Sequence, residues 1–156
     1  MDAADFTLRR AGPADAAAVD ALTRAAYARW VPIIGRKPRP MTADYARAVV
    51  EHRIDLLEEG ATLAALIELS FEPDHLLIVS LAVAPTFQGQ GLGTRLLAHA
   101  ERVAGEAGLP ELRLYTNRLM VANIALYARR GYQRYREEPF AGGTAIHMRK
   151  PTPLLT

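Results

Sequence analysis

A glycine-rich segment in the middle of the chain has the residue types that bind phosphate. Residues 83–94 read VAPTFQGQGLGT, with glycines at Gly89, Gly91 and Gly93. Glycines let the backbone turn tightly and let a ligand approach the amide groups. A helix that begins directly after such a turn adds unpaired N–H groups and a positive dipole end, which together bind anions. The pattern predicts a site for a phosphorylated ligand, although a tight turn without a ligand fits the glycines alone equally well.

Two common nucleotide-binding motifs do not match this segment. A mononucleotide P-loop requires a lysine after its last glycine, and residues 83–94 contain no lysine. A dinucleotide fingerprint requires the spacing G-x-G-x-x-G, whereas the glycines here are spaced G-x-G-x-G. A phosphorylated ligand of this segment would therefore belong to a class other than those bound by these two motifs.

The elements on either side of the turn are the clearest in the chain. Residues 76–84 read LLIVSLAVA, an almost wholly apolar run that is typical of a strand covered on both faces. Apolar residues then recur at helical spacing after the turn, and Gly108 and Pro110 close this helix. The stripe consists of Leu92, Leu96, Ala100, Val103 and Ala107.

The remaining pattern predicts strands and helices in mixed order. Residues 31–41 carry three prolines and three basic residues, so we expect a stiff basic loop without regular helix. Thr42 is the expected cap of a helix that follows this loop, and Thr116 or Asn117 that of a later one. The expected strands are 6–10, 54–58, 62–71, 76–84, 111–116, 132–138 and 144–149, and the expected helices are 14–29, 43–53, 92–107 and 119–130. This order predicts a mixed α/β sheet.

Composition limits the function classes. The 156 residues suit one domain, residues 1–150, followed by a frayed tail, residues 151–156. The net charge of +2 is small for a nucleic-acid binder, and no apolar run is long enough for a membrane span. Residues 1–6 are acidic and Ala-rich, which argues against a signal peptide. The chain has no cysteine, which excludes a disulfide framework and a thiolate metal site and suits the cytoplasm.

Two separated motifs resemble the GCN5-related N-acetyltransferases. Residues 88–93, QGQGLG, are similar to the family's Q/R-x-x-G-x-G/A signature, and Val83-Ala84-Pro85 looks like the strand end before it. Residues 126–132, LYARRGY, resemble the family's L-Y-x-x-x-G-F segment, and Arg10-Ala11 with Asp15 resembles its opening strand and helix. The motifs occur in the family's order and extend over most of the chain.

This resemblance implies a fold and a cofactor. The fold would be a three-layer αβα sandwich around a mixed, mostly antiparallel sheet of about seven strands. Acetyl-CoA would place its pyrophosphate on the amides of the turn and its pantetheine arm along the splayed central strand, with no metal. A backbone N–H of that strand would also polarise the thioester carbonyl. The implied cofactor-binding residues are Leu81, Ala82, Val83, Gln88, Gly89, Gln90, Gly91, Leu92, Gly93 and Thr94.

Tyr127 aligns with the family's general acid. The pKa of tyrosine is near 10 and that of a thiol near 8.5, so protonating the leaving thiolate is uphill by only about 2 kcal/mol. A tyrosine packed between helix and sheet is the structural alternative. Asn123 departs from the commonest family pattern, which has alanine there, and we interpret it either as a contact to the CoA arm or as a brace of the helix.

A general base is harder to identify. Tyr115 stands where some relatives have a glutamate, and the central strand has Ser80 as its one polar side chain. Glu68, Glu72, Asp74 and His75 lie nearby in the sequence, and we expect them to be solvated strand or turn residues. An α-amine with a pKa near 8 is roughly a tenth neutral at pH 7, so a low-pKa amine is the easier acceptor.

The resemblance also suggests where the acceptor binds. The family's acceptor site is walled by the first two helices and the loop between them, which here include Tyr27 and Trp30; a solvated basic loop with Trp30 capping the core is the alternative. The predicted activity is transfer of acetyl directly from acetyl-CoA to a primary amine of a small molecule or peptide in a ternary complex, since no cysteine can carry the acyl group. The alternative is a non-catalytic CoA-binding or regulatory module. Homodimers are common in the family, and neither nucleic acid nor membrane is an expected partner.

Overall fold

The computed structural model describes residues 5–154, which fall into two compact units. The first unit comprises Met1–Leu69 and Ser80–Leu96, and the second comprises Ser70–Val79 and Leu97–Thr156. The boundary between the units passes through two strands and one helix. No helix among residues 5–154 is long and apolar enough to cross a membrane.

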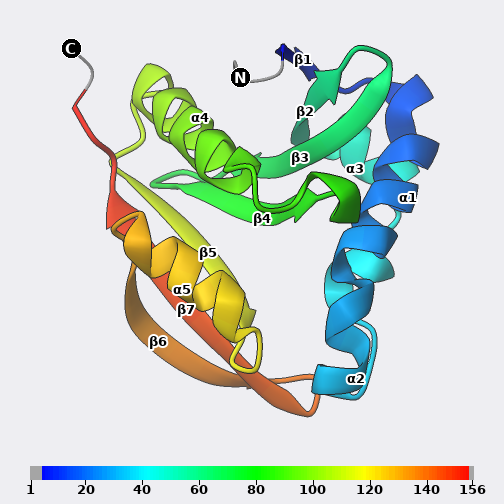
Figure 1. Ribbon diagram of the computed structural model, residues 1–156. Coiled ribbons are helices and arrows are strands. Elements are labelled where there is room, and N and C mark those ends of the chain that lie inside the picture. Colours follow the sequence, from blue (N-terminus) through cyan, green and yellow to red (C-terminus); the bar gives the residue numbers. More distant parts are fainter. Residues whose placement is uncertain (1–4, 155–156) are drawn as a thin grey trace. The chain divides into compact units, whose positions relative to one another are not determined.

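Seven strands form one mixed sheet in the order β1-β2-β3-β4-β5-β7-β6. β4 and β5 pair in parallel, whereas β1 with β2, β2 with β3, β5 with β7 and β6 with β7 are antiparallel. The predicted mixed, mostly antiparallel sheet of about seven strands is thus confirmed. The strands are β1 (Phe6–Arg10), β2 (Arg53–Glu59), β3 (Thr62–Phe71), β4 (Leu76–Val83), β5 (Glu111–Asn117), β6 (Gln133–Phe140) and β7 (Gly143–Pro151) (Figure 1).

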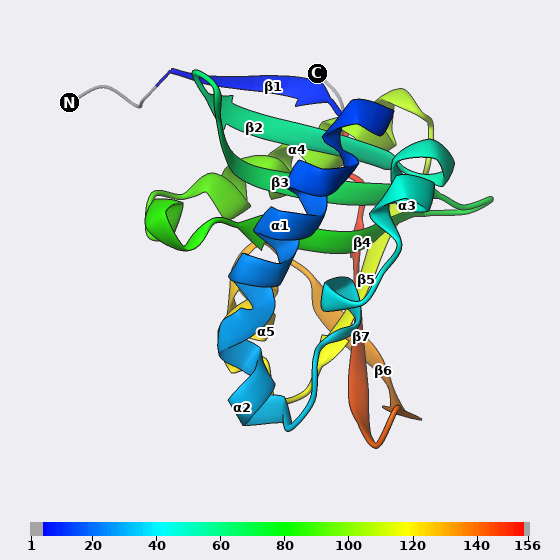
Figure 2. The ribbon, with the colours of Figure 1, turned by 90° about the vertical axis from the view of Figure 1, so that its right-hand side faces the viewer.

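In the first unit two helices pack on the antiparallel strands. α1 (Ala16–Tyr27) buries Val19, Leu22 and Ala26 at helical spacing, as the sequence predicts. α3 (Tyr45–Glu51) is short and lies beside α1 over β2 and β3 (Figure 2). β2 and β3 form a hairpin, in which Gly60 takes a positive φ of 59°.

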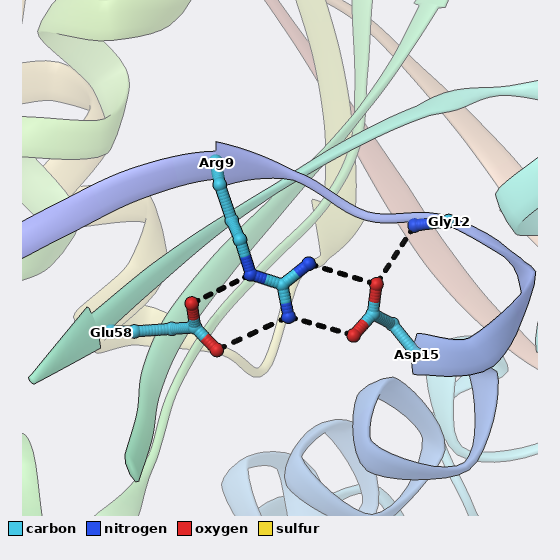
Figure 3. Close-up of polar contacts among 4 residues, drawn as sticks. All are labelled: Arg9, Gly12, Asp15 and Glu58. Carbon is cyan, nitrogen blue, oxygen red and sulfur yellow. Dashed lines mark hydrogen bonds and ion pairs between the residues drawn. The ribbon is translucent and has the colours of Figure 1, made fainter. Parts of the chain in front are cut away.

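An ion-pair network ties the start of α1 to the sheet. Arg9 on β1 donates to Glu58 on β2 through Nε (2.7 Å) and to Asp15 through both terminal nitrogens (3.0 and 2.8 Å). Asp15 also accepts from the Gly12 amide at 2.8 Å (Figure 3). The guanidinium fork and the amide lower the pKa of the Asp15 carboxyl from 3.8 to about 2. This network fixes the direction in which the chain leaves β1.

The second unit is built on β5, β7 and β6. β5 alternates, with Leu112, Leu114 and Thr116 buried. α5 (Val121–Arg129) runs along β5 and β7 (Figure 1). Gly131 follows this helix with a φ of 97°, the left-handed conformation in which glycine commonly ends helices. α4 (Leu92–Glu106) begins in the first unit and continues into the second.

Four local expectations differ from the structure. Residues 31–41 are not without helix: Val31–Ile34 form the short helix α2, because Pro32 lies in its first turn, where a missing N–H costs nothing. Asp44, not Thr42, caps α3 by accepting from the Arg47 amide. α5 begins after Met120, so Asn117 accepts from Leu119 in the preceding turn instead of capping the helix.

The fourth difference concerns the C-terminal tail. β7 extends to Pro151, and Thr152 bonds to the carbonyl groups of Pro110 and Leu109. Residues 151 and 152 therefore do not belong to a frayed tail. The N-terminal segment that argued against a signal peptide lies outside the described residues, except for Asp5 and Phe6.

Candidate active site

The glycine-rich turn lies between β4 and α4, in the first unit. Gly89 and Gly91 have φ values of 84° and 77°, a conformation that residues with a Cβ rarely adopt. A Cβ added at either glycine would meet no atom within 4 Å, and both residues are exposed. The turn therefore leaves its backbone open to a ligand at the point where α4 begins.

Two hydrogen bonds to backbone carbonyls hold the two ends of this turn. The Gln88 side chain donates through Nε2 to the Val83 carbonyl at 3.2 Å, which ties the turn to the end of β4. The Arg95 amide donates to the Gly91 carbonyl at 3.0 Å, which starts the helical hydrogen bonding. The amides at the start of a helix have no intrahelical acceptor, so they can bind phosphate oxygens.

The strand before the turn has one irregularity. The Glu72 amide donates to the His75 carbonyl, and the Ala84 amide donates to the Ala64 carbonyl. Residue 72 is therefore paired with residue 75, and residue 64 with residue 84. From 64 to 72 β3 advances eight residues, whereas from 75 to 84 the other strand advances nine. One extra residue on one strand is what a β-bulge produces. Leu81 and Ala82, predicted to border the pantetheine arm, are buried, and Val83 is half-buried.

A buried tyrosine reaches this strand from α1. The Tyr27 hydroxyl donates to the Leu81 carbonyl at 3.0 Å. Burial raises the pKa of Tyr27, and the Glu68 charge raises it further, while the Ser80 hydroxyl and the Leu81 bond act in the opposite direction. Ser80 Oγ is buried and makes no well-formed hydrogen bond within the described chain. Trp30, the other aromatic residue expected at the acceptor site, is also buried, with the Arg29 guanidinium 4.6 Å from its ring centroid.

Glu68 is not solvated, contrary to the expectation from sequence. The residue is 3% exposed on β3, and its carboxylate lies 2.6 Å from His52 Nδ1. Asp74 and His75 do lie in an exposed turn, where they bond to each other at 2.8 Å. The one indication in the sequence that Glu68 is buried is its place as the single charged residue in the apolar run of β3. Strand alternation alone does not show that both faces of β3 are covered.

The second unit holds the proposed general acid. Tyr127 on α5 is 6% exposed and packs edge-on against Tyr132, with ring centroids 6.1 Å apart. Asn123 lies one turn earlier on the same helix and is half-buried. Both residues therefore project from α5 on neighbouring turns.

Tyr115 lies in an aromatic cluster of the second unit. Its ring is 5.4 Å from the ring of His147, its partner on β7, and 6.3 Å from that of Phe140. His147 Nε2 lies 2.6 Å from Glu138, and this bond, followed by the bond to Arg136, lowers the pKa of the Glu138 carboxyl. This His–Glu pair cannot be predicted from residues adjacent in the sequence, because it depends on the register of β6 and β7.

The site residues predicted from sequence thus divide between the units. The turn residues, the three β4 positions, Tyr27 and Trp30 lie in the first unit, and Tyr115, Asn123 and Tyr127 lie in the second. Within residues 5–154 no three His, Asp or Glu side chains come together as metal ligands would.

Comparisons with known proteins agree with this architecture. Residues 19–132 match the sequence pattern of the acetyltransferase (GNAT) family. Over 100 residues the chain is 32% identical to the uncharacterized protein YxbD of Bacillus subtilis (strain 168). The matched segment covers 64% of this chain and 62% of that relative, so the chain spans less than two thirds of the relative's length.

Solved structures share the fold at low identity. The ribosomal-protein-S18-alanine N-acetyltransferase from Escherichia coli superposes with a TM-score of 0.78 at 23% identity, over 97% of each chain. The PaiA N-acetyltransferase from Thermoplasma acidophilum, solved in complex with coenzyme A, superposes with a TM-score of 0.77 at 19% identity, over 94% of this chain and 99% of that one. At these identities the likeness concerns the fold.

Proposed function

Since the chain belongs to the acetyltransferase (GNAT) family, we propose that it transfers an acetyl group from acetyl-CoA to a primary amine of a small molecule or peptide. The observation that carries this proposal is the open glycine-rich turn at the start of α4. Its positive φ values and exposed backbone suit a polyanionic ligand, and the PaiA relative was solved with coenzyme A. Acetyl-CoA is made and used inside cells, so we place the activity in the cytoplasm.

In the proposed complex the pyrophosphate lies on the amides of Gly89–Thr94 and Gln88 shapes the approach. The pantetheine arm runs along Leu81, Ala82 and Val83. They lie in the segment between residues 75 and 84 that contains one extra residue, and such a residue frees backbone groups from the ladder. A backbone N–H freed in this way would stabilise the oxyanion that forms at the thioester carbonyl. Asn123 is the proposed side-chain contact to the arm, and Tyr27, Trp30 and Tyr115 are the proposed aromatic residues of the acceptor site.

The chemistry is direct attack. The neutral amine nitrogen forms a bond to the thioester carbonyl carbon, the C–S bond breaks, and the thiolate takes a proton from the Tyr127 hydroxyl. The proton that the nitrogen loses on forming the amide restores the Tyr127 hydroxyl. Since the chain has no cysteine, no acyl-cysteine intermediate precedes this step. Both substrates must then be bound together, as a ternary-complex mechanism requires.

Acetyl-CoA consumption with a panel of primary amines tests the proposal, with Tyr127→Phe as the variant. We expect Tyr127→Phe to lower kcat by about 100-fold, the lower range for general acid catalysis, without changing the Kd of acetyl-CoA. Tyr132→Phe is the matched control, because the buried Tyr132 hydroxyl has no hydrogen-bond partner within the described chain. This control should keep the wild-type kcat.

The opposite outcome is equally clear. If acetyl-CoA binds, no amine of the panel is acetylated and Tyr127→Phe behaves as the wild type, the chain is a CoA-binding module without catalytic function. If Tyr132→Phe loses as much activity as Tyr127→Phe, the loss reflects packing around the two rings, and Tyr127 is not the acid.

A further inference from the structure

Glu68 is a buried carboxylate whose partner carries no permanent charge. It is 3% exposed, it bonds to His52 Nδ1 at 2.6 Å, and no lysine or arginine of the described chain forms an ion pair with it. Burying an ionised carboxylate is costly unless it is paired, so such a group in a stable core requires an explanation. Asp55 on the neighbouring strand shows the usual solution: it is 2% exposed and pairs with Arg53 at 3.0 Å.

The hydroxyl groups around Glu68 lead toward β4. β3 lies beside β4 in the sheet, and the Ala84 amide donates to the Ala64 carbonyl, so four residues further along β3 Glu68 lies near Ser80 of β4. After the larger effect of burial, the Glu68 carboxylate also raises the pKa of Tyr27 on α1 and of Tyr45 on α3. Asp20 on α1 adds to the effect on Tyr45. Tyr27 in turn contacts the Leu81 carbonyl, and the Ser80 hydroxyl lies buried next to it in the chain. Polar groups thus extend from the half-exposed His52 ring to the strand proposed to hold the thioester.

The proposed reaction has one proton to dispose of. An ammonium acceptor and acetyl-CoA give an amide, a thiol and one free proton. The nitrogen loses two protons: one reaches the sulfur and the other must leave the site. Tyr127 accounts for the first, and β4 has no carboxylate to accept the second.

We propose that Glu68 and His52 form the exit path for this second proton. The proton passes from the acceptor nitrogen, through the Tyr27 hydroxyl or a bound water, to the Glu68 carboxylate. His52 donates to this carboxylate from Nδ1 and holds it in place, and after the product leaves, Glu68 returns the proton to solvent beside the half-exposed His52 ring. This inference rests on the proposed acetyl transfer, and it makes Glu68 a proton relay that acts from the interior of the first unit.

Glu68→Gln tests the relay, because glutamine keeps the size and a hydrogen bond to His52 but cannot carry the proton. The acceptors are alaninamide, with an α-amine, and Nα-acetyl-lysinamide, with a side-chain amine of higher pKa. For the acceptor that wild type uses, we expect kcat/KM at pH 7 to fall about 100-fold, with an unchanged KM for acetyl-CoA. The loss should shrink as the pH rises, since the neutral amine and hydroxide then replace the relay. If both acceptors react, the loss should be larger for the lysine amine.

Asp55→Asn is the matched control, since it neutralises a buried carboxylate on the adjacent strand. It should lower stability but leave the pH profile of kcat/KM parallel to that of wild type. If Glu68→Gln does not fold, His52→Gln, at the half-exposed end, should lower kcat/KM about 10-fold with the same pH dependence. A loss that is equal at every pH, or no loss, overturns the relay. If wild type acetylates neither these two amines nor the wider panel, the proposed function fails and the relay fails with it.

Discussion

Two carboxylate clusters of the first unit differ in what holds their charge. Around Arg9, the carboxylates of Asp15 and Glu58 share a guanidinium that is 44% exposed and remains protonated at every physiological pH. Around Glu68, the carboxylate is buried and its bonded partner is a histidine. The first cluster pairs its carboxylates with a permanent positive charge, whereas no permanent positive charge is paired with Glu68 among the described residues.

This difference separates a structural role from a chemical one. The Arg9 cluster connects β1, β2 and the turn before α1 (Figure 3). The Glu68 cluster joins the half-exposed His52 ring to a buried carboxylate on β3, the strand next to β4. In the proposed transfer reaction this carboxylate accepts the proton that the reaction releases.

The largest expected contrast is in activity. Glu68→Gln should lower kcat/KM about 100-fold at pH 7, the range of general base catalysis, whereas Glu58→Gln in the Arg9 cluster should stay within about two-fold of wild type. Steady-state assays of the two variants under the same conditions make the comparison. Equal losses would mean that the two clusters do not differ in role.

A smaller effect is expected where the buried cluster meets β4. Tyr27→Phe removes the hydroxyl bonded to the Leu81 carbonyl, and Tyr45→Phe removes the one bonded to the Pro40 carbonyl at 2.7 Å. Each should cost about 1 kcal/mol of unfolding free energy in urea titrations. Only Tyr27→Phe should also lower kcat/KM, by about 10-fold. If both variants lose the same activity, Tyr27 has no part in proton transfer.

The smallest effect is expected in the Arg9 cluster and concerns stability alone. Asp15→Asn weakens the hydrogen bonds to Arg9 and Gly12. We expect the free energy of unfolding at pH 7 to fall by about 1 kcal/mol, the usual cost of a lost capping interaction. Since the pKa of folded Asp15 is about 2 and the ordinary value is 3.8, the stabilisation is complete above pH 4 and is lost as the pH falls through 2. Urea unfolding of both proteins at pH 7, 4 and 3 should show the difference narrowing below pH 4. A difference that grows in acid would contradict the assigned role of Asp15.

Elements whose signals lie in residues adjacent along the chain could be predicted from the sequence. The apolar run of β4 and the stripe of α4 from Leu92 to Val103 are local signals, and both lie where the sequence predicts them. Ala107, the last residue of the predicted stripe, is exposed and lies just after α4. Two expectations differed because more than one residue type could act at the same place. Pro32 lies in the first turn of a helix instead of preventing one, and Asp44 rather than Thr42 accepts a hydrogen bond from an amide in the first turn of α3.

The turn is predictable for the same reason, because all its residues are contiguous. The His52–Glu68 and Glu138–His147 pairs are not, since each requires the register of two strands and the burial of both faces. Glu68 looked like a solvated strand residue because nothing within its own strand shows that α1 and α3 cover it. Its partner, 16 residues earlier in the chain, becomes visible only when β2 and β3 are paired.

Calorimetric titration of CoA into Gly91→Glu tests the placement of the cofactor most directly. The substitution puts a side chain and a negative charge where the pyrophosphate should lie. Gly60→Glu is the matched control, because Gly60 also has a positive φ with open space around it but lies in the β2–β3 hairpin. We expect Gly91→Glu to weaken CoA binding about 10- to 100-fold, the loss of one charge-assisted hydrogen bond or more, and Gly60→Glu to keep the wild-type Kd. An unchanged Kd for Gly91→Glu would contradict the placement of acetyl-CoA on this turn.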